Sequence, residues 1–357
     1  MPSRRHFLLT SLALAAPVRA AVDYPPVVPS RLVFPRDHGA HPEYRTEWWY
    51  LTGWLDGPGG APLGFQVTFF RTRTEVDSAN PSAFAAKQLI IAHAALADPA
   101  RATLLHDERI ARTGLGGAAA SEVDTAVHLG TWSFVRLASG DYRCVLPARG
   151  FTLEFAARPT QPLLLQGEAG YSRKGPSAAQ ASYYYSQPQL TVRAQLTRDG
   201  RSQALTGSGW LDHEWSSTLL TADAAGWDWV GMNLDDGSAL TAFQVRRQGA
   251  ANPPLYAYAS LRPPNGATRT FGPEEVRFAR RSQWTSPRTR AAWPVAQEIH
   301  IADRHFVTRP LMNDQELDSR MTTGAVYWEG ASELLEGERP VGRGYLEMTG
   351  YVAPIRL

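Results

Sequence analysis

Two segments of this chain, about 180 residues apart, repeat one pattern of residues. Residues 48–71 read WWYLTGWLD, a glycine-rich turn and GFQVTFFR, and residues 227–247 read WDWVGMNLD, an Asp-Gly turn and SALTAFQVRR. Each segment has the pattern of a β hairpin, and such a repeat is typical of a duplicated structural unit. We therefore expect two β-barrel-like halves of roughly 150 residues each, a usual domain size. The alternative is two unrelated hairpins, because Asp-Gly favours tight turns in any context.

The rest of the chain also favours β structure. Short runs of alternating apolar and polar residues are separated by Gly, Pro, Asn and Asp, which predicts an all-β fold. Helix signals are few, and the best of them predict short helices near residues 82–87 and 273–278. The expected strands are 47–55, 63–72, 88–96, 131–138, 142–148, 151–157, 190–197, 202–212, 226–234, 238–247, 256–263, 297–303, 325–330 and 344–352.

Composition excludes several classes of protein. With 357 residues, 43% of them hydrophobic and 20% charged, the chain has ample material for folded cores. The formal charge of +2 includes three arginines among residues 1–20, and without them 33 basic residues face 34 acidic ones. No basic field is left to attract nucleic acid. Cys144 is the only cysteine, so no intramolecular disulfide forms, and we expect it to be a small buried side chain.

The first 20 residues have the form of an export signal. Paired arginines, Arg4 and Arg5, precede a short apolar run that ends in small residues at a signal-peptidase-like site, Val18-Arg19-Ala20. The order SRRHFL resembles a twin-arginine signal, and a Sec-type leader is the alternative. The apolar run is too short to span a bilayer. We therefore expect a protein that is exported to the periplasm and is not transmembrane.

The stretch GWLDHEW, residues 209–215, sets three titratable groups inside an aromatic segment. In a strand, alternation places His213 on one face and Asp212 and Glu214 on the other. In a barrel that encloses a ligand, one of these faces lines the cavity. We expect His213 to face that cavity and at least one of the acids to be structural.

Eight sequence blocks carry a resemblance to a known family. From about Arg31 to Leu357 they occur in that family's order: HPEYRTEWWYLTGWL, GFQVTFFRTRT, QGEAGYSRKGP with YYYSQPQL, GWLDHEWSS, GWDWVGMNLDDG, DQELDS, YWEGA and GRGYLEMTGY. The chain thereby resembles the carotenoid 1,2-hydratase/AttH-type lipocalin-like family. The resemblance implies two lipocalin-like (calycin) β-barrel domains packed together, expected at residues 31–200 and 201–357. Similar proteins include hydratases of isoprenoid or flavonoid double bonds, pericyclases, and exported proteins encoded beside ABC transporters.

Hydration of a carbon–carbon double bond needs three kinds of group. A carboxylic acid must stay protonated in an apolar site, a carbocation must be tolerated, and a base must orient water. The candidate acids are Asp212, Glu214 and Asp228, and the candidate base is His213. Aromatic faces favour a nearby cation. The candidate ligand-binding aromatics are Trp48, Trp49, Trp215, Trp227 and Tyr184.

Structural interpretations compete with this chemistry. Buried acids and histidines are often held only by hydrogen bonds to their neighbours, and most of the 11 tryptophans are expected to fill the barrels. Tyr184 belongs to a run of three tyrosines that fits either a ligand mouth or an aromatic edge strand. Glu43 and Glu47, beside Trp48, lie in one of the strongest blocks of the family resemblance, but ion pairs with Arg45 or Arg71 would explain them as well. We expect no metal and no cofactor, because the three titratable groups of GWLDHEW are adjacent rather than at ligand spacing.

The sequence therefore leaves three hypotheses about the function. The first is a hydratase-like lyase that adds water to a C=C bond of an isoprenoid-type substrate by acid/base chemistry. The second is a non-catalytic periplasmic carrier of a lipid or another hydrophobic molecule, working with an ABC transporter. The third is a pericyclase or cyclase-like enzyme. All three imply a hydrophobic small-molecule ligand.

Overall fold

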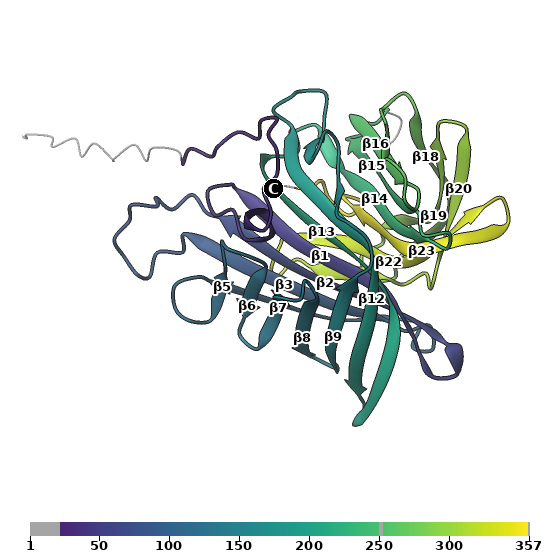
Figure 1. The fold of residues 1–357 in the computed structure, drawn as a ribbon, viewed down its shortest axis with the longest axis horizontal. Helices are drawn as coiled ribbons and strands as arrows, with labels where there is room; N and C mark the ends of the chain where they lie inside the picture. Colours follow the sequence, from purple (N-terminus) through teal and green to yellow (C-terminus); the bar gives the residue numbers. More distant parts are fainter. Residues whose placement is uncertain (1–21, 250–252, 356–357) are drawn as a thin grey trace, which may run out of the picture.

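The computed structural model describes residues 22–249 and 253–355. These residues form two curled, barrel-like antiparallel sheets, which confirms the predicted all-β architecture. In Figure 1 the first sheet (purple to teal) lies at the lower left and the second (green to yellow) at the upper right. The predicted leader, residues 1–20, lies outside the described residues.

The first sheet has 13 strands, paired in the order β4-β3-β2-β1-β13-β12-β9-β8-β7-β6-β5, with β10 and β11 added to β12. Their bounds are β1 (Thr46–Asp56), β2 (Pro62–Arg73), β3 (Gln88–Ala97), β4 (Leu104–Arg112), β5 (Ala118–Ala120), β6 (Ala126–Leu129), β7 (Trp132–Arg136), β8 (Tyr142–Ala148), β9 (Phe151–Pro159), β10 (Leu164–Leu165), β11 (Tyr171–Arg173), β12 (Ala181–Arg198) and β13 (Arg201–Thr218).

The second sheet has 10 strands, paired in the order β17-β16-β15-β14-β23-β22-β20-β19-β18, with β21 added to β22. Their bounds are β14 (Ala224–Leu234), β15 (Ala239–Arg247), β16 (Tyr256–Arg262), β17 (Arg269–Phe271), β18 (Val276–Thr285), β19 (Ala292–Ile301), β20 (Arg304–Pro310), β21 (Glu316–Ser319), β22 (Ala325–Glu336) and β23 (Arg339–Thr349).

The two sheets share one topology. In each, the first strand pairs with the second strand on one side and with the last strand on the other: β1 with β2 and β13, and β14 with β15 and β23. The two repeated sequence segments are thus the antiparallel hairpins β1–β2 and β14–β15, at equivalent places in their sheets. This equivalence is the structural counterpart of the sequence repeat.

The chain passes from one sheet to the other later than residue 200. Strand β13 begins at Arg201 and runs back along β12 and β1, so it belongs entirely to the first sheet. The connection to the second sheet lies between Thr218 and Ala224. The GWLDHEW stretch is therefore the final part of the first sheet, at its central pairing with β1.

The expected short helices do not form. Residues 82–87 and 273–275 are turns and extended loop, and residues from Val276 onward enter β18. Such short pieces cannot offset the cost of helix nucleation. Helical structure in the described residues consists of two 3₁₀ turns, η1 (Arg36–His38) and η2 (Pro58–Gly60). Among those residues, no helix combines the length and apolarity needed to cross a membrane.

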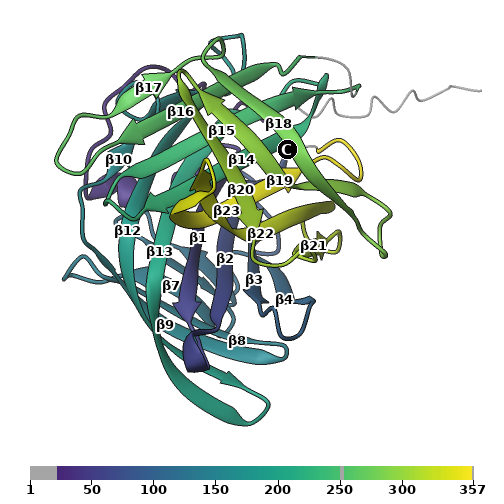
Figure 2. The ribbon, with the colours of Figure 1, turned by 90° about the vertical axis from the view of Figure 1, so that its right-hand side faces the viewer.

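Each curled sheet encloses its own apolar core, and a third cluster lies between the sheets. Side chains such as Leu51, Phe65 and Leu153 fill the first barrel, and others such as Val230 and Leu346 fill the second. Strands β1, β2 and β13 contact β23, β22 and β14, and Figures 1 and 2 show the two sheets stacked there. The third cluster occupies this junction and consists of aromatic and aliphatic side chains, including those of Tyr50, Trp54, Trp210, Trp229, Phe243, Tyr258 and Tyr345.

Candidate functional site

A pocket opens between the two sheets rather than inside either barrel. Both sheets and the loops beside them contribute to its wall, which is mainly apolar but contains four carboxyl groups. Its lining residues are Thr46, Trp48, Tyr50, Thr68, Phe70, Lys174, Tyr184, Asp212, Glu214, Leu219, Leu220, Trp227, Trp229, Phe243, Val245, Tyr327, Glu329 and Glu347.

Strand alternation explains why acids and aromatics meet in this pocket. On β1 and β13 the register places Trp48 opposite Glu214 and Tyr50 opposite Asp212. Cross-strand partners share a face of the sheet. This face turns away from the first barrel's core and toward the second sheet, so one side of the pocket combines aromatic rings with two carboxyl groups.

Asp212 lines the pocket and accepts three hydrogen bonds from neighbouring side chains. Its Oδ1 accepts bonds from Ser186 Oγ at 2.5 Å and from Trp210 Nε1 at 2.8 Å, and its Oδ2 accepts one from the Tyr184 hydroxyl at 2.9 Å. Burial raises the pKa of Asp212 to about 7, although these donors favour the charged form. The Tyr184 oxygen in turn accepts a bond from Trp229 Nε1 at 3.1 Å. Asp212 is therefore fixed in place and titrates near neutral pH.

Glu214 has a cationic partner. Its Oε1 lies 2.9 Å from Lys174 Nζ, and both side chains are buried. The same ammonium group lies 4.5 Å from the centre of the Tyr184 ring and 4.3 Å from that of Phe243. Lys174 thus connects the loop after β11 to both sheets, and its charge is stabilised by a carboxylate and two π faces.

The second sheet contributes a pair of opposed acids. Glu329 on β22 and Glu347 on β23 are direct cross-strand partners. Glu329 Oε2 accepts a 2.5 Å bond from the Tyr50 hydroxyl, and Glu347 Oε1 accepts a 2.9 Å bond from Trp227 Nε1. Burial raises the pKa of Glu329 to about 7, and burial together with the Glu329 charge raises the pKa of Glu347 well above its usual range. Two neighbouring carboxylates repel each other, so ionising both in a buried site costs free energy. This pair therefore holds at least one proton at neutral pH.

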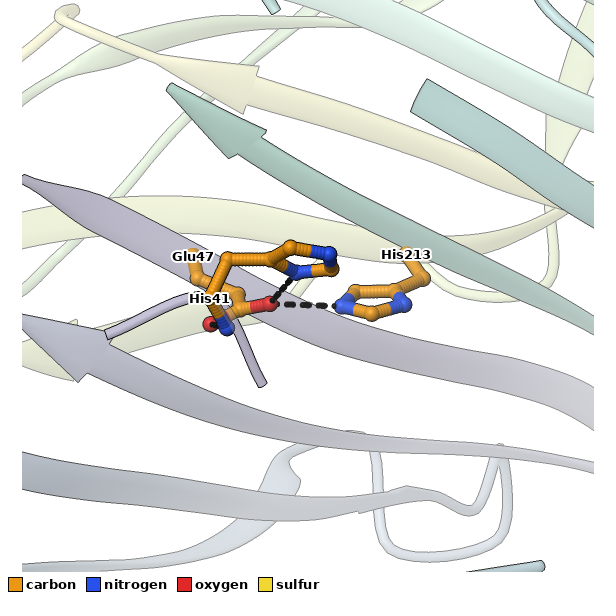
Figure 3. Close-up of side chains that lie close together, drawn as sticks. All are labelled: His41, Glu47 and His213. Carbon is orange, nitrogen blue, oxygen red and sulfur yellow. Dashed lines mark hydrogen bonds and ion pairs between the residues drawn. The ribbon is translucent and has the colours of Figure 1, made fainter. Parts of the chain in front are cut away.

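His213 lies on the opposite face of β13, in a separate buried cluster. Its Nε2 lies 2.9 Å from Glu47 Oε1, and the same oxygen lies 2.8 Å from His41 Nδ1. In Figure 3, dashed lines join one Glu47 oxygen to both imidazoles. Arg71 Nε donates to the other oxygen of Glu47 at 2.7 Å, and the Tyr185 hydroxyl lies 3.1 Å from His213 Nδ1.

The charges in this cluster are mutually balanced. Burial disfavours an ionised Glu47, yet the Arg71 charge and bonds from His213 and His41 hold its pKa well below the usual range. Burial likewise opposes a charged His41, but hydrogen bonds to Asp37 and Glu47 raise its pKa. Burial lowers the pKa of His213 to about 4, against the attraction of Glu47. The cluster ties the segment before β1 to β1 and β13.

The structure separates the residues singled out from the sequence into two sets. Asp212, Glu214, Trp48, Trp227 and Tyr184 line the pocket. Four others lie outside it: Asp228, His213, Trp49 and Trp215. The expectation that His213 faces the cavity is reversed, because the cavity lies between the sheets and not within the first barrel.

Each of the four residues outside the pocket has a structural environment. Asp228 accepts bonds from Gln244 Nε2 at 2.7 Å and the Tyr351 hydroxyl at 2.9 Å, and it also pairs with Arg246. The remaining three pack with imidazoles. Trp215 stacks on His41 at a ring-centre distance of 3.7 Å, and Trp49 stacks on His213 at 4.7 Å.

Several pocket residues were not among the sequence candidates. They include Tyr50, Lys174, Trp229, Glu329 and Glu347. A usable signal existed for the two glutamates, because each interrupts an otherwise apolar strand, in VYWEGA and GYLEMTG. Burying an ionisable group costs free energy, so an acid within an apolar strand indicates a candidate functional residue.

Two antiparallel barrel-like sheets with an acid-lined pocket between them define a double lipocalin-like protein. The sequence profile of the AttH-like family matches residues 25–351, and the chain belongs to that family. A crystal structure assigned to AttH, from Nitrosomonas europaea, is 52% identical, with a TM-score of 0.86, and the match covers 93% of this chain and 100% of that one.

More distant structures share the fold. Kievitone hydratase from Nectria haematococca is 14% identical, with a TM-score of 0.68 over 90% of this chain and 94% of that one. CghA in complex with Sch210972 is 13% identical, with a TM-score of 0.53 over 87% of this chain and 90% of that one. Among curated protein sequences, none matches this chain significantly.

Proposed function

We propose that this protein binds an apolar, unsaturated small molecule in the pocket between its sheets and adds water to a C=C bond, as a hydratase-like lyase on an isoprenoid-type substrate. The observation that carries this proposal is the set of buried carboxyl groups with pKa values near 7, at Asp212 and Glu329, in a pocket walled by tryptophan. An acid that holds its proton at neutral pH is what alkene protonation requires. The fold shared with kievitone hydratase is consistent with this chemistry.

The acid in this proposal is Glu329. Its Oε2 accepts the hydrogen bond from Tyr50, and its side chain lines the pocket. The π electrons of the double bond take the proton from Glu329, forming a C–H bond and leaving a carbocation on the neighbouring carbon. The faces of Trp48 and Trp227 stabilise that cation.

The base in this proposal is Asp212. A water oxygen bonds to the cationic carbon and gives one proton to Asp212 Oδ2, which accepts a single hydrogen bond, from Tyr184. Solvent then returns a proton from Asp212 to Glu329, and the net change is the addition of one water molecule. This assignment replaces His213 as the base, because His213 lies on the other face of the sheet.

Labelled water distinguishes this reaction from the other two functions. The wild-type protein is incubated in H₂¹⁸O with an acyclic isoprenoid probe, farnesol or squalene, and the products are measured by mass spectrometry. A hydratase yields a product heavier by one labelled water. A cyclase-like enzyme, the third function that the family resemblance implies, yields an isomer without label. With a non-catalytic carrier, the recovered probe is chemically unchanged. Native mass spectrometry then detects the intact probe bound to the protein.

The carrier function is favoured by one feature of the pocket. Most of its wall is aliphatic or aromatic, as at Leu219, Leu220, Phe243 and Val245, so it would retain a lipid without any reaction. In that case we propose an ABC transporter as the partner that loads or unloads the ligand. Recovery of unreacted ligand from purified protein would favour this second candidate.

We also propose that the protein works in the periplasm. The support is the leader-like sequence at residues 1–20, with Arg4 and Arg5 before an apolar run. Export of an already folded protein by the twin-arginine route suits a large antiparallel β fold, because non-local strand pairing is slow to form. Pairing of β1 with β13 is such a contact.

A further inference from the structure

Two groups of three metal-ligand side chains occur in the described residues. One is His41, Glu47 and His213, and the other is Glu298, His300 and His305. In each group the ligand atoms lie within 4.8 Å of one another. Their surroundings differ in ways that decide which of them can take up an ion.

The first group is already satisfied by hydrogen bonds. Its Glu47 oxygen lies 2.8 and 2.9 Å from the two imidazole nitrogens, which are hydrogen-bond distances, and Arg71 places a guanidinium charge 2.7 Å from the other oxygen. Exposure of the three side chains is 5% or less. An entering cation would have to displace these hydrogen-bonded protons in a buried site, so this group carries no metal proposal.

The second group lies on the hairpin formed by β19 and β20. A two-residue turn joins these strands, and His300 and His305 are direct cross-strand partners. Their rings stack at a centre-to-centre distance of 4.4 Å with an interplanar angle of 24°. Glu298 lies two residues before His300, on the same face of β19. The hairpin therefore holds three ligands together on one surface.

The distances in this group are too long for hydrogen bonds and close to those around a metal. Glu298 Oε2 lies 3.9 Å from His300 Nε2 and 3.6 Å from His305 Nε2. Tetrahedral ligands at bond lengths of about 2.0–2.2 Å are roughly 3.3 to 3.6 Å apart. The two distances from Glu298 are at or slightly above this range, and all three ligand atoms lie within 4.8 Å of one another. Arg281 Nη1 lies 3.2 Å from Oε1 of Glu298. The second oxygen, Oε2, is the one that lies near the imidazoles.

Solvent reaches all three ligands. Their exposed fractions are 34% for His300, 31% for Glu298 and 43% for His305. An ion can therefore enter directly and keep a water molecule in its remaining position. Two imidazoles and one carboxylate suit borderline divalent ions such as Zn²⁺, Ni²⁺ and Cu²⁺.

We propose that Glu298, His300 and His305 form a surface binding site for a divalent transition-metal ion, with Zn²⁺ as its simplest occupant. This site is on the outer part of the second sheet and is independent of the pocket between the sheets. It departs from the expectation of no metal drawn from the sequence, where these residues lie in the unremarkable stretch QEIHIADRHF.

Calorimetric titration with Zn²⁺ tests the proposal on the untagged, chelator-treated protein. The expected result is one Zn²⁺ per chain, with at least a tenfold loss of affinity in His300→Ala and in His305→Ala and a smaller loss in Glu298→Gln. His128→Ala is the matched control, because His128 is an exposed strand histidine of the first sheet, and it should bind like the wild type. Titration with Co²⁺ should give the visible absorption of a tetrahedral N/O site in the wild type and in His128→Ala, but not in His300→Ala or His305→Ala.

Three results would overturn the proposal. The first is absence of stoichiometric binding to the wild type. The second is unchanged affinity in both histidine variants, which would mean unspecific binding. The third is loss of binding in His41→Asn with the His300 and His305 variants unaffected, which would place the ion in the buried group. Circular dichroism of each variant confirms that it is folded before titration.

Discussion

The Tyr50 hydroxyl of the first sheet donates a 2.5 Å hydrogen bond to Oε2 of Glu329 in the second sheet. Both side chains are buried at the junction of the sheets and line the same pocket. Through strand register, Tyr50 is also the cross-strand partner of Asp212. One tyrosine is therefore hydrogen-bonded to the carboxyl group that we assign as acid and pairs across the strands with the residue that we assign as base.

Removing this hydroxyl should raise the pKa of Glu329. In Tyr50→Phe the donor that favours the carboxylate is lost while burial is unchanged, so the protonated form gains stability. Infrared spectroscopy of the protonated carboxyl band measures this, with Glu329→Gln identifying the band. We expect its titration midpoint to move above the wild-type value, which lies at about 7. Tyr351→Phe, which alters a bond to Asp228 outside the pocket, is the control and should leave the midpoint unchanged.

Asp212 should make stability fall as pH rises. Its pKa is about 7 in the folded protein and about 3.9 in an unfolded chain, so between these values the folded state binds the extra proton. The contribution of this proton to the free energy of unfolding is fully present below pH 4 and is lost as pH rises through 7. The difference between wild type and Asp212→Asn should change by about 1.4 kcal/mol per pH unit in this window, to a total on the order of 4 kcal/mol.

Urea denaturation from pH 4 to 8 measures this difference, since groups that titrate alike in both proteins cancel. Constant offset between the two stability curves would show that Asp212 is ionised in the folded pocket at all these pH values. Such a result would remove the argument for a base poised near neutral pH.

The buried Glu47 cluster should support folding rather than ligand binding. Glu47→Gln leaves the Arg71 guanidinium without its 2.7 Å partner in a buried site, and we expect a loss of about 3–5 kcal/mol of unfolding free energy. Adding Arg71→Met should cost less than the sum of the two single changes, because it removes the unpaired charge. Ligand binding per folded molecule should equal that of the wild type. Reduced binding by folded Glu47→Gln would show instead that this face of β13 acts on the pocket.

Export should depend on the paired arginines. Replacing both Arg4 and Arg5 by Lys should retain the protein in the cytoplasm if it uses the twin-arginine route. Cell fractionation with immunoblotting measures the distribution, and Arg19→Lys, near the expected cleavage site, is the control. Normal export of the double variant would assign the leader to the Sec route.

The duplicated fold was accessible from sequence because the relevant signals are local. The two Trp-rich hairpins and their turns predict β1–β2 and β14–β15, and alternation correctly places Asp212 and Glu214 on one face of β13. Which face lines a cavity depends on where the second sheet packs, and no local pattern encodes that. The side of His213 was therefore assigned wrongly.

Long-range pairing explains the other omissions. Glu329 and Glu347 reach the pocket only because β22 and β23 pair beside β14 and stack on the first sheet. Trp48 and Trp49 are adjacent in sequence, yet only Trp48 lines the pocket, since neighbouring residues point to opposite faces. The sequence alone does not show which of two adjacent tryptophans faces the pocket.

The most direct test of the proposed site is incorporation of ¹⁸O from labelled water by two variants of one strand. Glu329→Gln removes the assigned acid from β22, whereas Glu333→Gln changes a partly exposed residue of the same strand that pairs with Arg309 outside the pocket. With the isoprenoid probe that the wild type hydrates, we predict at least a 100-fold loss of labelled product for Glu329→Gln, within the range for removal of a general acid, and wild-type activity for Glu333→Gln. Undiminished labelling by folded Glu329→Gln would contradict the account.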